Sequence, residues 1–196
     1  MIVKLRDRLL TSSIYEEMRR YKVRHEDVIY AHMLDQHISA LGRAKDYTLP
    51  MAVGEIIHLG LDRIFTSADE KCVDLYYPDG LGRLHQNAYR FVRRTGSGFY
   101  VRLCGSADAM VEYDGSMIPV ELKTTRGSKI RNEWVRRTET YAFLYGTGRA
   151  LLIVYNVVTG AENDFLVELE DKNTIVERVL LWLKGLYPRP NLEAGG

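Results

Sequence analysis

The sequence has few cysteines, and it has no long apolar run. Its two cysteines, Cys72 and Cys104, are too few for a disulfide framework or for a four-cysteine zinc or iron–sulfur site. We therefore expect both to be small buried hydrophobic residues. The longest apolar run, residues 150–155, has the length of a strand. Since a membrane-spanning helix needs ~20 consecutive apolar residues, we expect no membrane association.

The net charge is also small, and glutamine is rare. A net charge of +1 at pH 7 carries no overall signature of nucleic-acid binding, so such binding must come from local basic clusters. The first residues are too charged for the apolar core of a signal peptide, and we expect a cytoplasmic protein. Glutamine occurs only at Gln36 and Gln86, a scarcity that is typical of thermophile proteins.

Length and composition are those of one ordinary domain. With 196 residues, 46% of them apolar and 27% charged, the chain is long enough for one core and too short for two. We expect a single domain over residues 1–196, with a helical N-terminal extension at 1–50, a core at 51–187 and a flexible tail at 188–196.

Hydrophobic spacing predicts helices on both sides of a run of strands. Helical patterns cover 13–43, 53–65, 133–146 and 174–187, and Pro188 and Pro190 would stop the last helix. Apolar runs between turn residues predict strands at 73–77, 88–94, 99–105, 106–113, 117–125, 149–158 and 164–170. This order indicates an α/β or α+β domain with a mixed sheet.

The segment 105–125 carries the most informative pattern. Asp114-Gly115 between two alternating apolar runs is a strong hairpin signal. A two-residue turn there would place Asp108 opposite Glu121, with Lys123 two residues along on the same face. A four-residue loop would keep this grouping, whereas a three-residue loop would put Asp108 on the other face.

Two opposed carboxylates repel each other and need a compensating charge. Oxygen ligands favour Mg²⁺ or Mn²⁺, and such an ion can polarise a phosphate and activate water. Lys123 could orient that water or stabilise the transition state. This set fits phosphodiester hydrolysis best. The alternative is a surface salt-bridge ladder, but the apolar neighbours of Asp108 and Glu121 place these charges on a largely buried sheet, where unpaired charge is costly.

Four short blocks, in order from about Gly54 to Tyr141, resemble the PD-(D/E)XK nuclease superfamily. The likeness is to its RecB-like branch, which includes the CRISPR-associated exonucleases. The blocks read Gly54-Glu55-Ile56-Ile57-His58, Gly105-Ser106-Ala107-Asp108, Glu121-Leu122-Lys123 and Arg137-Thr138-Glu139-Thr140-Tyr141. The resemblance implies an α/β, restriction-endonuclease-like core, in which a mixed β-sheet is flanked by helices.

The resemblance also implies site residues. Asp108, Glu121 and Lys123 would be catalytic, and the metal ligands would be His58, Asp108, Glu121 and the backbone carbonyl of Leu122. The fourth block departs from the family pattern, because Arg137 stands where the family has glutamine. An arginine there could contact a phosphate in bidentate fashion. Tyr141 matches the family tyrosine and is equally interpretable as a core residue.

A further departure concerns cysteine. The CRISPR-associated members typically carry four cysteines for an iron–sulfur cluster, three of them near the C-terminus. The last residues of this chain have none. We therefore expect no iron–sulfur cluster, and a role in CRISPR adaptation is not implied.

Basic residues follow the predicted metal site. The predicted DNA contacts are Arg126, Lys129, Arg131, Arg136, Arg137 and Tyr141. They could guide phosphates toward the site, and Trp134, Tyr141 and Tyr145 could stack on bases. A solvated basic helix face with its aromatic residues in the core is an equal alternative.

The leading hypothesis is a Mg²⁺- or Mn²⁺-dependent deoxyribonuclease that acts on single-stranded DNA or duplex ends. One alternative is a junction resolvase or restriction-type endonuclease of the same superfamily. Another is a catalytically silent DNA-binding or assembly subunit with the same fold. Each of these three hypotheses is compatible with a homo-oligomer.

Overall fold

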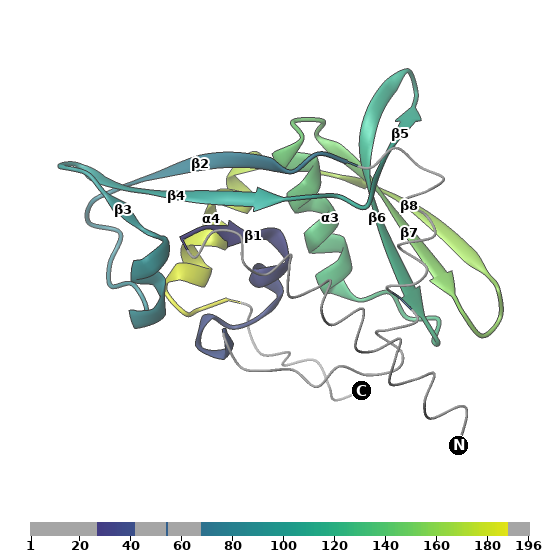
Figure 1. Ribbon diagram of the computed structural model, residues 1–196, viewed down its shortest axis with the longest axis horizontal. Helices are drawn as coiled ribbons and strands as arrows, with labels where there is room; N and C mark the ends of the chain where they lie inside the picture. Colours follow the sequence, from purple (N-terminus) through teal and green to yellow (C-terminus); the bar gives the residue numbers. More distant parts are fainter. Residues whose placement is uncertain (1–26, 42–53, 55–67, 188–196) are drawn as a thin grey trace, which may run out of the picture.

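Two four-stranded mixed sheets form the framework of the chain, for which a computed structural model describes residues 27–41, Gly54 and residues 68–187 (Figure 1). In the first sheet β4 pairs with β1 in parallel and with β2 and β3 antiparallel. The strands of this sheet are β1 (Ile29–Tyr30), β2 (Lys71–Pro78), β3 (Arg93–Arg94) and β4 (Gly98–Gly105).

The second sheet has the order β5-β6-β7-β8. Its strands are β5 (Ala109–Tyr113), β6 (Ser116–Thr125), β7 (Arg149–Asn156) and β8 (Glu162–Glu168). The central pair β6–β7 is parallel and the outer pairs are antiparallel. A parallel pair needs a crossover connection, and α3 (Asn132–Leu144) supplies it. The strand β6 is buried at every position from Ile118 to Leu122, as expected of a strand that is covered on both faces.

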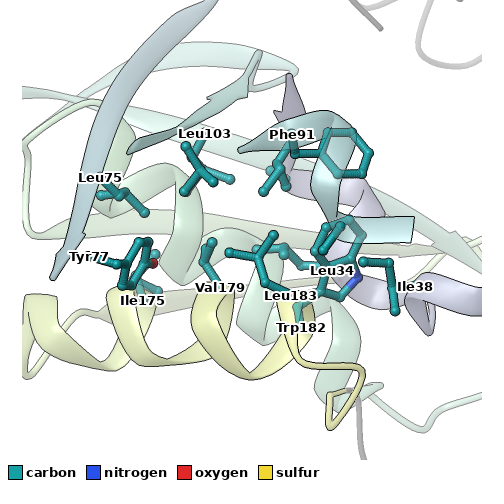
Figure 2. Close-up of a cluster of buried hydrophobic side chains, with 14 of the residues drawn as sticks. Leu34, Ile38, Leu75, Tyr77, Phe91, Leu103, Ile175, Val179, Trp182 and Leu183 are labelled. Atoms are coloured by element: carbon teal, nitrogen blue, oxygen red, sulfur yellow. The ribbon is translucent and has the colours of Figure 1, made fainter. Parts of the chain in front are cut away.

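The larger hydrophobic core lies between the first sheet and α4 (Lys172–Leu183). Alternate residues of β2 and β4 point inward, while Ile175, Val179 and Trp182 form one face of α4 (Figure 2). The inward sheet residues are Leu75, Tyr77, Phe99, Val101 and Leu103. A smaller cluster joins Trp134 of α3 to β7 and β8 of the second sheet. The helix α3 thus lies at the junction of the two sheets (Figure 1).

The predicted α/β class with a mixed sheet flanked by helices is confirmed, and it is compatible with a restriction-endonuclease-like core. The strands over 73–77, 99–105, 109–113, 117–125, 149–156 and 164–168 and the helix that starts near residue 133 form where their patterns predict them. Within the described residues, no helix is long and apolar enough to cross a membrane.

The helix predicted over 13–43 is wrong for residues 27–41. This segment forms β1 and two 3-10 turns, η1 (Ala31–Asp35) and η2 (Ile38–Ala40). Ile29 pairs with Leu103 of β4, and Leu34 and Ile38 enter the core. Apolar residues four apart are compatible with a helix, but here a strand and two tight turns bury them.

Two further element predictions need correction. The strand predicted at 88–94 is mostly a 3-10 helix, η3 (Gln86–Phe91), followed by the short β3. The helix predicted to 187 ends earlier, because Gly185 has φ of +73° and stops α4 before Pro188. For the helix predicted at 53–65, Gly54 is helical and the other residues lie outside the described part, as do 1–26 and the tail.

The two cysteines form a disulfide, so the expectation that they are unpaired hydrophobic residues is wrong. Cys72 of β2 lies directly opposite Cys104 of β4 in the antiparallel ladder. A separation of 32 residues along the chain carries no information about this pairing, which the sheet register creates. Glu70 lies beside the two sulfurs, but sulfurs that are bonded to each other are not thiolate ligands.

Candidate active site

The hairpin of β5 and β6 has the predicted turn and register. Tyr113 pairs with Ser116, and the ladder continues to Ala109 opposite Val120. Asp114 and Gly115 both have positive φ, +51° and +72°, as a two-residue type I′ turn requires. The local turn chemistry therefore determines which residues of the two strands meet.

Asp108 was predicted to lie directly opposite Glu121, but β5 begins at Ala109 and the ladder ends one residue short of Asp108. Its backbone N–H donates to the carbonyl of Val120 at 3.0 Å. Its carboxylate Oδ2 accepts the backbone N–H of Leu122 at 2.7 Å. Asp108 thus extends the hairpin through its side chain, and its carboxylate lies on the Glu121-Leu122-Lys123 segment.

Glu121 is the most buried charged residue of the described part, with 2% exposure. Its carboxylate forms ion pairs with Lys123 and, at 3.4 Å, with Nη1 of Arg137. Burial raises the pKa of Glu121, and the negative charge of Asp108 raises it further, while Lys123 and Arg137 oppose these effects. The three predicted catalytic residues therefore form one electrostatic group.

Lys123 contacts more than the carboxylate of Glu121. Its Nζ also donates to the backbone carbonyl of Leu122 at 3.2 Å, which is the carbonyl predicted to be a metal ligand. A carbonyl oxygen has two lone pairs, so this hydrogen bond leaves it able to accept a second partner.

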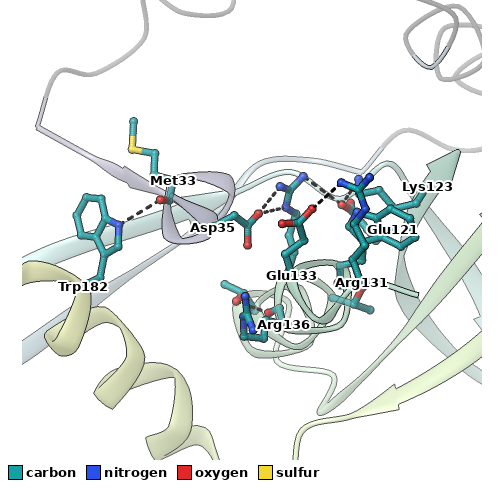
Figure 3. A network of polar contacts seen from close by, with 12 residues as sticks. Met33, Asp35, Glu121, Lys123, Arg131, Glu133, Arg136 and Trp182 are labelled. Carbon is teal, nitrogen blue, oxygen red and sulfur yellow. Dashed lines mark hydrogen bonds and ion pairs between the residues drawn. The ribbon is translucent and has the colours of Figure 1, made fainter. Parts of the chain in front are cut away.

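Arg137 was predicted to contact DNA phosphates, but the structure places its guanidinium between two carboxylates. Nε donates to Oδ2 of Asp35 at 2.7 Å, Nη2 pairs with the same oxygen, and Nη1 reaches Glu121. Figure 3 shows Asp35 and Glu121 within this network. These contacts use three of the five N–H donors of the guanidinium, so Arg137 is already paired with two carboxylates, and a contact with a DNA phosphate stays a prediction.

Asp35 is a site residue that the sequence did not indicate. It ends η1 and lies 102 residues before Arg137 in the chain. Burial raises the pKa of its carboxyl, and the charge and hydrogen bonds of Arg137 oppose that rise. No motif or spacing links these two positions, so only the packing of η1 against α3 reveals their contact.

Charged side chains of both signs converge in the described part of the site. Three carboxylates, Asp35, Asp108 and Glu121, lie near two cations, Lys123 and Arg137. Buried charge is costly unless it is compensated. Carboxylate and carbonyl oxygens are suitable donors for Mg²⁺ or Mn²⁺.

His58, the predicted fourth ligand, lies outside the described residues. Gly54, the glycine of the same block, is described and lies close to β6. A Cβ atom added to Gly54 would come within 3.2 Å of the Thr124 hydroxyl. The start of the first block is therefore next to the residue that follows Lys123.

The remaining predicted DNA contacts differ in how exposed their side chains are. Arg126, Lys129 and Arg131 are exposed on the segment between β6 and α3, where they are accessible to a polyanion. Arg136 is half-buried, and its guanidinium lies over the ring of Tyr187.

The aromatic residues predicted to stack on bases are less accessible. Tyr141 has 6% exposure and belongs to the large core, and Trp134 is equally buried. The hydroxyl of Tyr145 donates to the carbonyl of Asp69 at 2.6 Å and accepts the N–H of Ala107. Burial does not fit a stacking role for Tyr141 or Trp134, and the alternative that they are core residues holds.

Comparison with known proteins supports the fold alone. No protein-family model matches the sequence, and no curated protein matches it. The chain is similar to a solved structure named "Crystal structure of SSO0001", with a TM-score of 0.63 and 20% identity. The match covers 91% of this chain and 84% of that one. At this identity the likeness concerns the arrangement of the backbone.

Proposed function

We propose that this chain is a Mg²⁺- or Mn²⁺-dependent deoxyribonuclease that hydrolyses phosphodiester bonds. The observation that carries the proposal is the convergence of Asp108, Glu121 and Lys123 at the open end of the β5–β6 hairpin. The grouping is similar to the one expected from the resemblance of the sequence blocks to the PD-(D/E)XK superfamily.

The oxygen atoms of Asp108, Glu121 and the Leu122 carbonyl would hold the metal ion, with His58 as a further proposed ligand. When bound, the ion would polarise the scissile phosphate and lower the pKa of a water molecule. The chain's own residues prepare this site. Asp108 is oriented by the N–H of Leu122, and burial places Glu121 where its charge interacts strongly with its surroundings.

Lys123 would supply the positive charge beside the reacting phosphate. Its side chain has 17% exposure, so its ammonium lies at the boundary between the buried carboxylate and solvent. From there it can orient a water molecule or stabilise negative charge on the phosphate oxygens. The exposed Arg126, Lys129 and Arg131 would attract the DNA backbone toward this edge.

The substrate that we propose is single-stranded DNA or a duplex end. The test uses end-labelled single-stranded and duplex DNA, with Mn²⁺, Mg²⁺ or EDTA. We expect cleavage with either metal and none with EDTA. Cleavage in EDTA, or cleavage by both Asp108→Ala and Lys123→Ala, would contradict the mechanism.

A closed single-stranded circle separates the alternatives within the superfamily. A strict exonuclease cannot start on a circle, whereas a single-strand endonuclease opens it. A junction resolvase would leave linear DNA intact and make paired nicks in a four-way junction. The proposed homo-oligomer, a dimer in the resolvase case, is tested by sedimentation of the intact protein.

A non-catalytic DNA-binding subunit is the second candidate. It is favoured by one observation, namely that Glu121 already has two cationic partners, Lys123 and Arg137. This candidate predicts DNA binding without cleavage and no increase in melting temperature when Mn²⁺ is added.

We also propose a cytoplasmic location. Disulfides are rare in the cytoplasm of mesophiles, but they are common in intracellular proteins of hyperthermophiles. The Cys72–Cys104 bond therefore agrees with a thermophile origin, which the scarcity of glutamine also favours.

A further inference from the structure

The guanidinium of Arg137 has two acidic neighbours that hold it unequally. Toward Asp35 it presents Nε at 2.7 Å and also Nη2, both on the same oxygen. Toward Glu121 it presents Nη1 alone, at 3.4 Å. Charge-assisted hydrogen bonds are stronger when they are short and doubled. Arg137 is therefore bound to Asp35 more firmly than to Glu121.

Trp182 of α4 holds the backbone on both sides of Asp35 in place. The indole Nε1 of Trp182 donates to the carbonyls of Met33 and Gln36, at 3.1 Å and 2.8 Å. These two carbonyls flank Asp35 in the chain, and Trp182 is fully buried in the large core. The backbone that carries Asp35 is thereby anchored to α4 (Figure 3).

The position of Arg137 matters because a guanidinium and a metal ion would compete for the same atom. Nη1 of Arg137 and Nζ of Lys123 both contact Oε1 of Glu121. A second, shorter bond from Arg137 would occupy more of this carboxylate and neutralise its charge. A divalent ion prefers carboxylate oxygens that keep their negative charge.

We propose that Asp35 is a positioning residue that acts through Arg137, holding its guanidinium back so that Glu121 can bind a divalent cation. The inference rests on the proposed metal-dependent function and extends it to a residue outside the four sequence blocks. It assigns to Asp35 no contact with the metal ion or the DNA.

The experiment measures Mn²⁺ binding to the full chain by titration calorimetry and by electron paramagnetic resonance, without DNA. Asp35→Asn frees Arg137 to pair fully with Glu121, and we expect the dissociation constant for Mn²⁺ to rise by roughly 10–100-fold, the usual effect of losing an outer-shell partner. Arg137→Gln removes the competitor, so this variant should bind Mn²⁺ at least as tightly as the unaltered protein.

The double variant Asp35→Asn/Arg137→Gln tests whether Asp35 acts through Arg137. It should bind Mn²⁺ as Arg137→Gln does, because the residue through which Asp35 acts is absent. The double variant also removes both members of the ion pair, so it avoids a buried unpaired charge. Asp74→Asn is the matched control, since Asp74 also accepts two hydrogen bonds from one arginine, Arg102, on the exposed sheet surface.

The outcomes separate this inference from the proposed function. Unchanged Mn²⁺ affinity in a folded Asp35→Asn would overturn the inference alone. So would a double variant that binds Mn²⁺ tenfold more weakly than Arg137→Gln, because Asp35 would then act directly. No Mn²⁺ binding by the unaltered protein would overturn the metal-dependent function itself, and the inference with it.

Discussion

The Asp108 carboxylate accepts the backbone N–H of Leu122 at 2.7 Å. This side-chain hydrogen bond continues the β5–β6 hairpin where its backbone pairing ends. It brings an acid from the start of one strand onto the strand that carries Glu121 and Lys123. The same bond makes Asp108 both a structural and a proposed catalytic residue, and substitutions can separate the two roles.

Asp108→Asn should remove activity and preserve the fold. The asparagine carbonyl can still accept the N–H of Leu122, but the negative charge is lost. We expect DNA cleavage to slow by roughly 10²–10³-fold, the effect of losing one electrostatic group in an active site. Cleavage rates with Mn²⁺ and thermal melting measure the two properties. Asp114→Asn, in the exposed turn, should change neither, and an active Asp108→Asn would refute the assignment.

Lys123→Met should destabilise the protein, because it takes one cation from the buried Glu121. Breaking a buried ion pair costs about 3–5 kcal/mol, and we expect the lower end because Arg137 stays in contact. The double variant Glu121→Gln/Lys123→Met should cost less than the sum of the two single changes. Urea denaturation measures each free energy of unfolding, and strict additivity would show that the pair is not coupled.

Stability should fall at alkaline pH, partly through Tyr77. Burial raises the pKa of Tyr77 above its ordinary value, and its hydroxyl donates to the carbonyl of Val176 at 2.7 Å. The unfolded state then loses this proton at about pH 10 while the folded state retains it. The contribution of Tyr77 to the free energy of unfolding is therefore fully present below that pH. It declines as the pH rises toward the pKa of Tyr77 in the folded state.

Tyr77→Phe tests this pH dependence. It should cost about 1 kcal/mol at neutral pH, through the lost hydrogen bond. Above pH 10 its free energy of unfolding should decline less steeply than that of the unaltered protein. Denaturant melts from pH 7 to 11 provide the comparison, and parallel alkaline slopes would rule out a contribution from Tyr77.

Reduction of the Cys72–Cys104 bond should lower stability. The bond closes a loop with a sequence separation of 32, for which the chain-entropy estimate is about 3–4 kcal/mol. The free energy of unfolding should fall by this order when a phosphine reductant is added. Cys72→Ala should have the lower value from the start and should not respond to reductant. Equal stability with and without reductant would contradict the expectation.

Gly105→Ala should destabilise the contact between β4 and α3. An added Cβ would lie 2.8 Å from Cε1 of Tyr141 and 3.0 Å from Cδ1 of Leu144. Overpacking of this kind costs about 1–3 kcal/mol. Gly96→Ala is the control, because nothing lies within 4 Å of its added Cβ and its φ is not in the positive region. Similar melting temperatures for the two variants would exclude close packing as the reason for this glycine.

Several features were predictable because their causes are local in sequence. The positive-φ turn at Asp114-Gly115 and the apolar alternation on either side determine the hairpin register within about 20 residues of chain. The stripe of Trp134, Thr138 and Tyr141 likewise predicts α3 and its buried face. These local rules predict the hairpin up to Ala109 opposite Val120, and Asp108 joins Glu121 and Lys123 through its own hydrogen bond with Leu122.

Other features arise only when distant segments pack together. Ile29 becomes a strand residue because β4 offers it a partner, although its neighbours have helical spacing. Cys72 and Cys104 bond because two strands place them opposite each other. Asp35 and Arg137 meet across 102 positions.

The sequence by itself thus determined the hairpin, its acids and its lysine, since turn geometry and side-chain alternation act over a few residues. The tertiary structure alone decided which charges surround them. It placed Arg137, one of the predicted DNA contacts, between Asp35 and Glu121, because a buried charge pairs with whatever opposite charge the packing brings near.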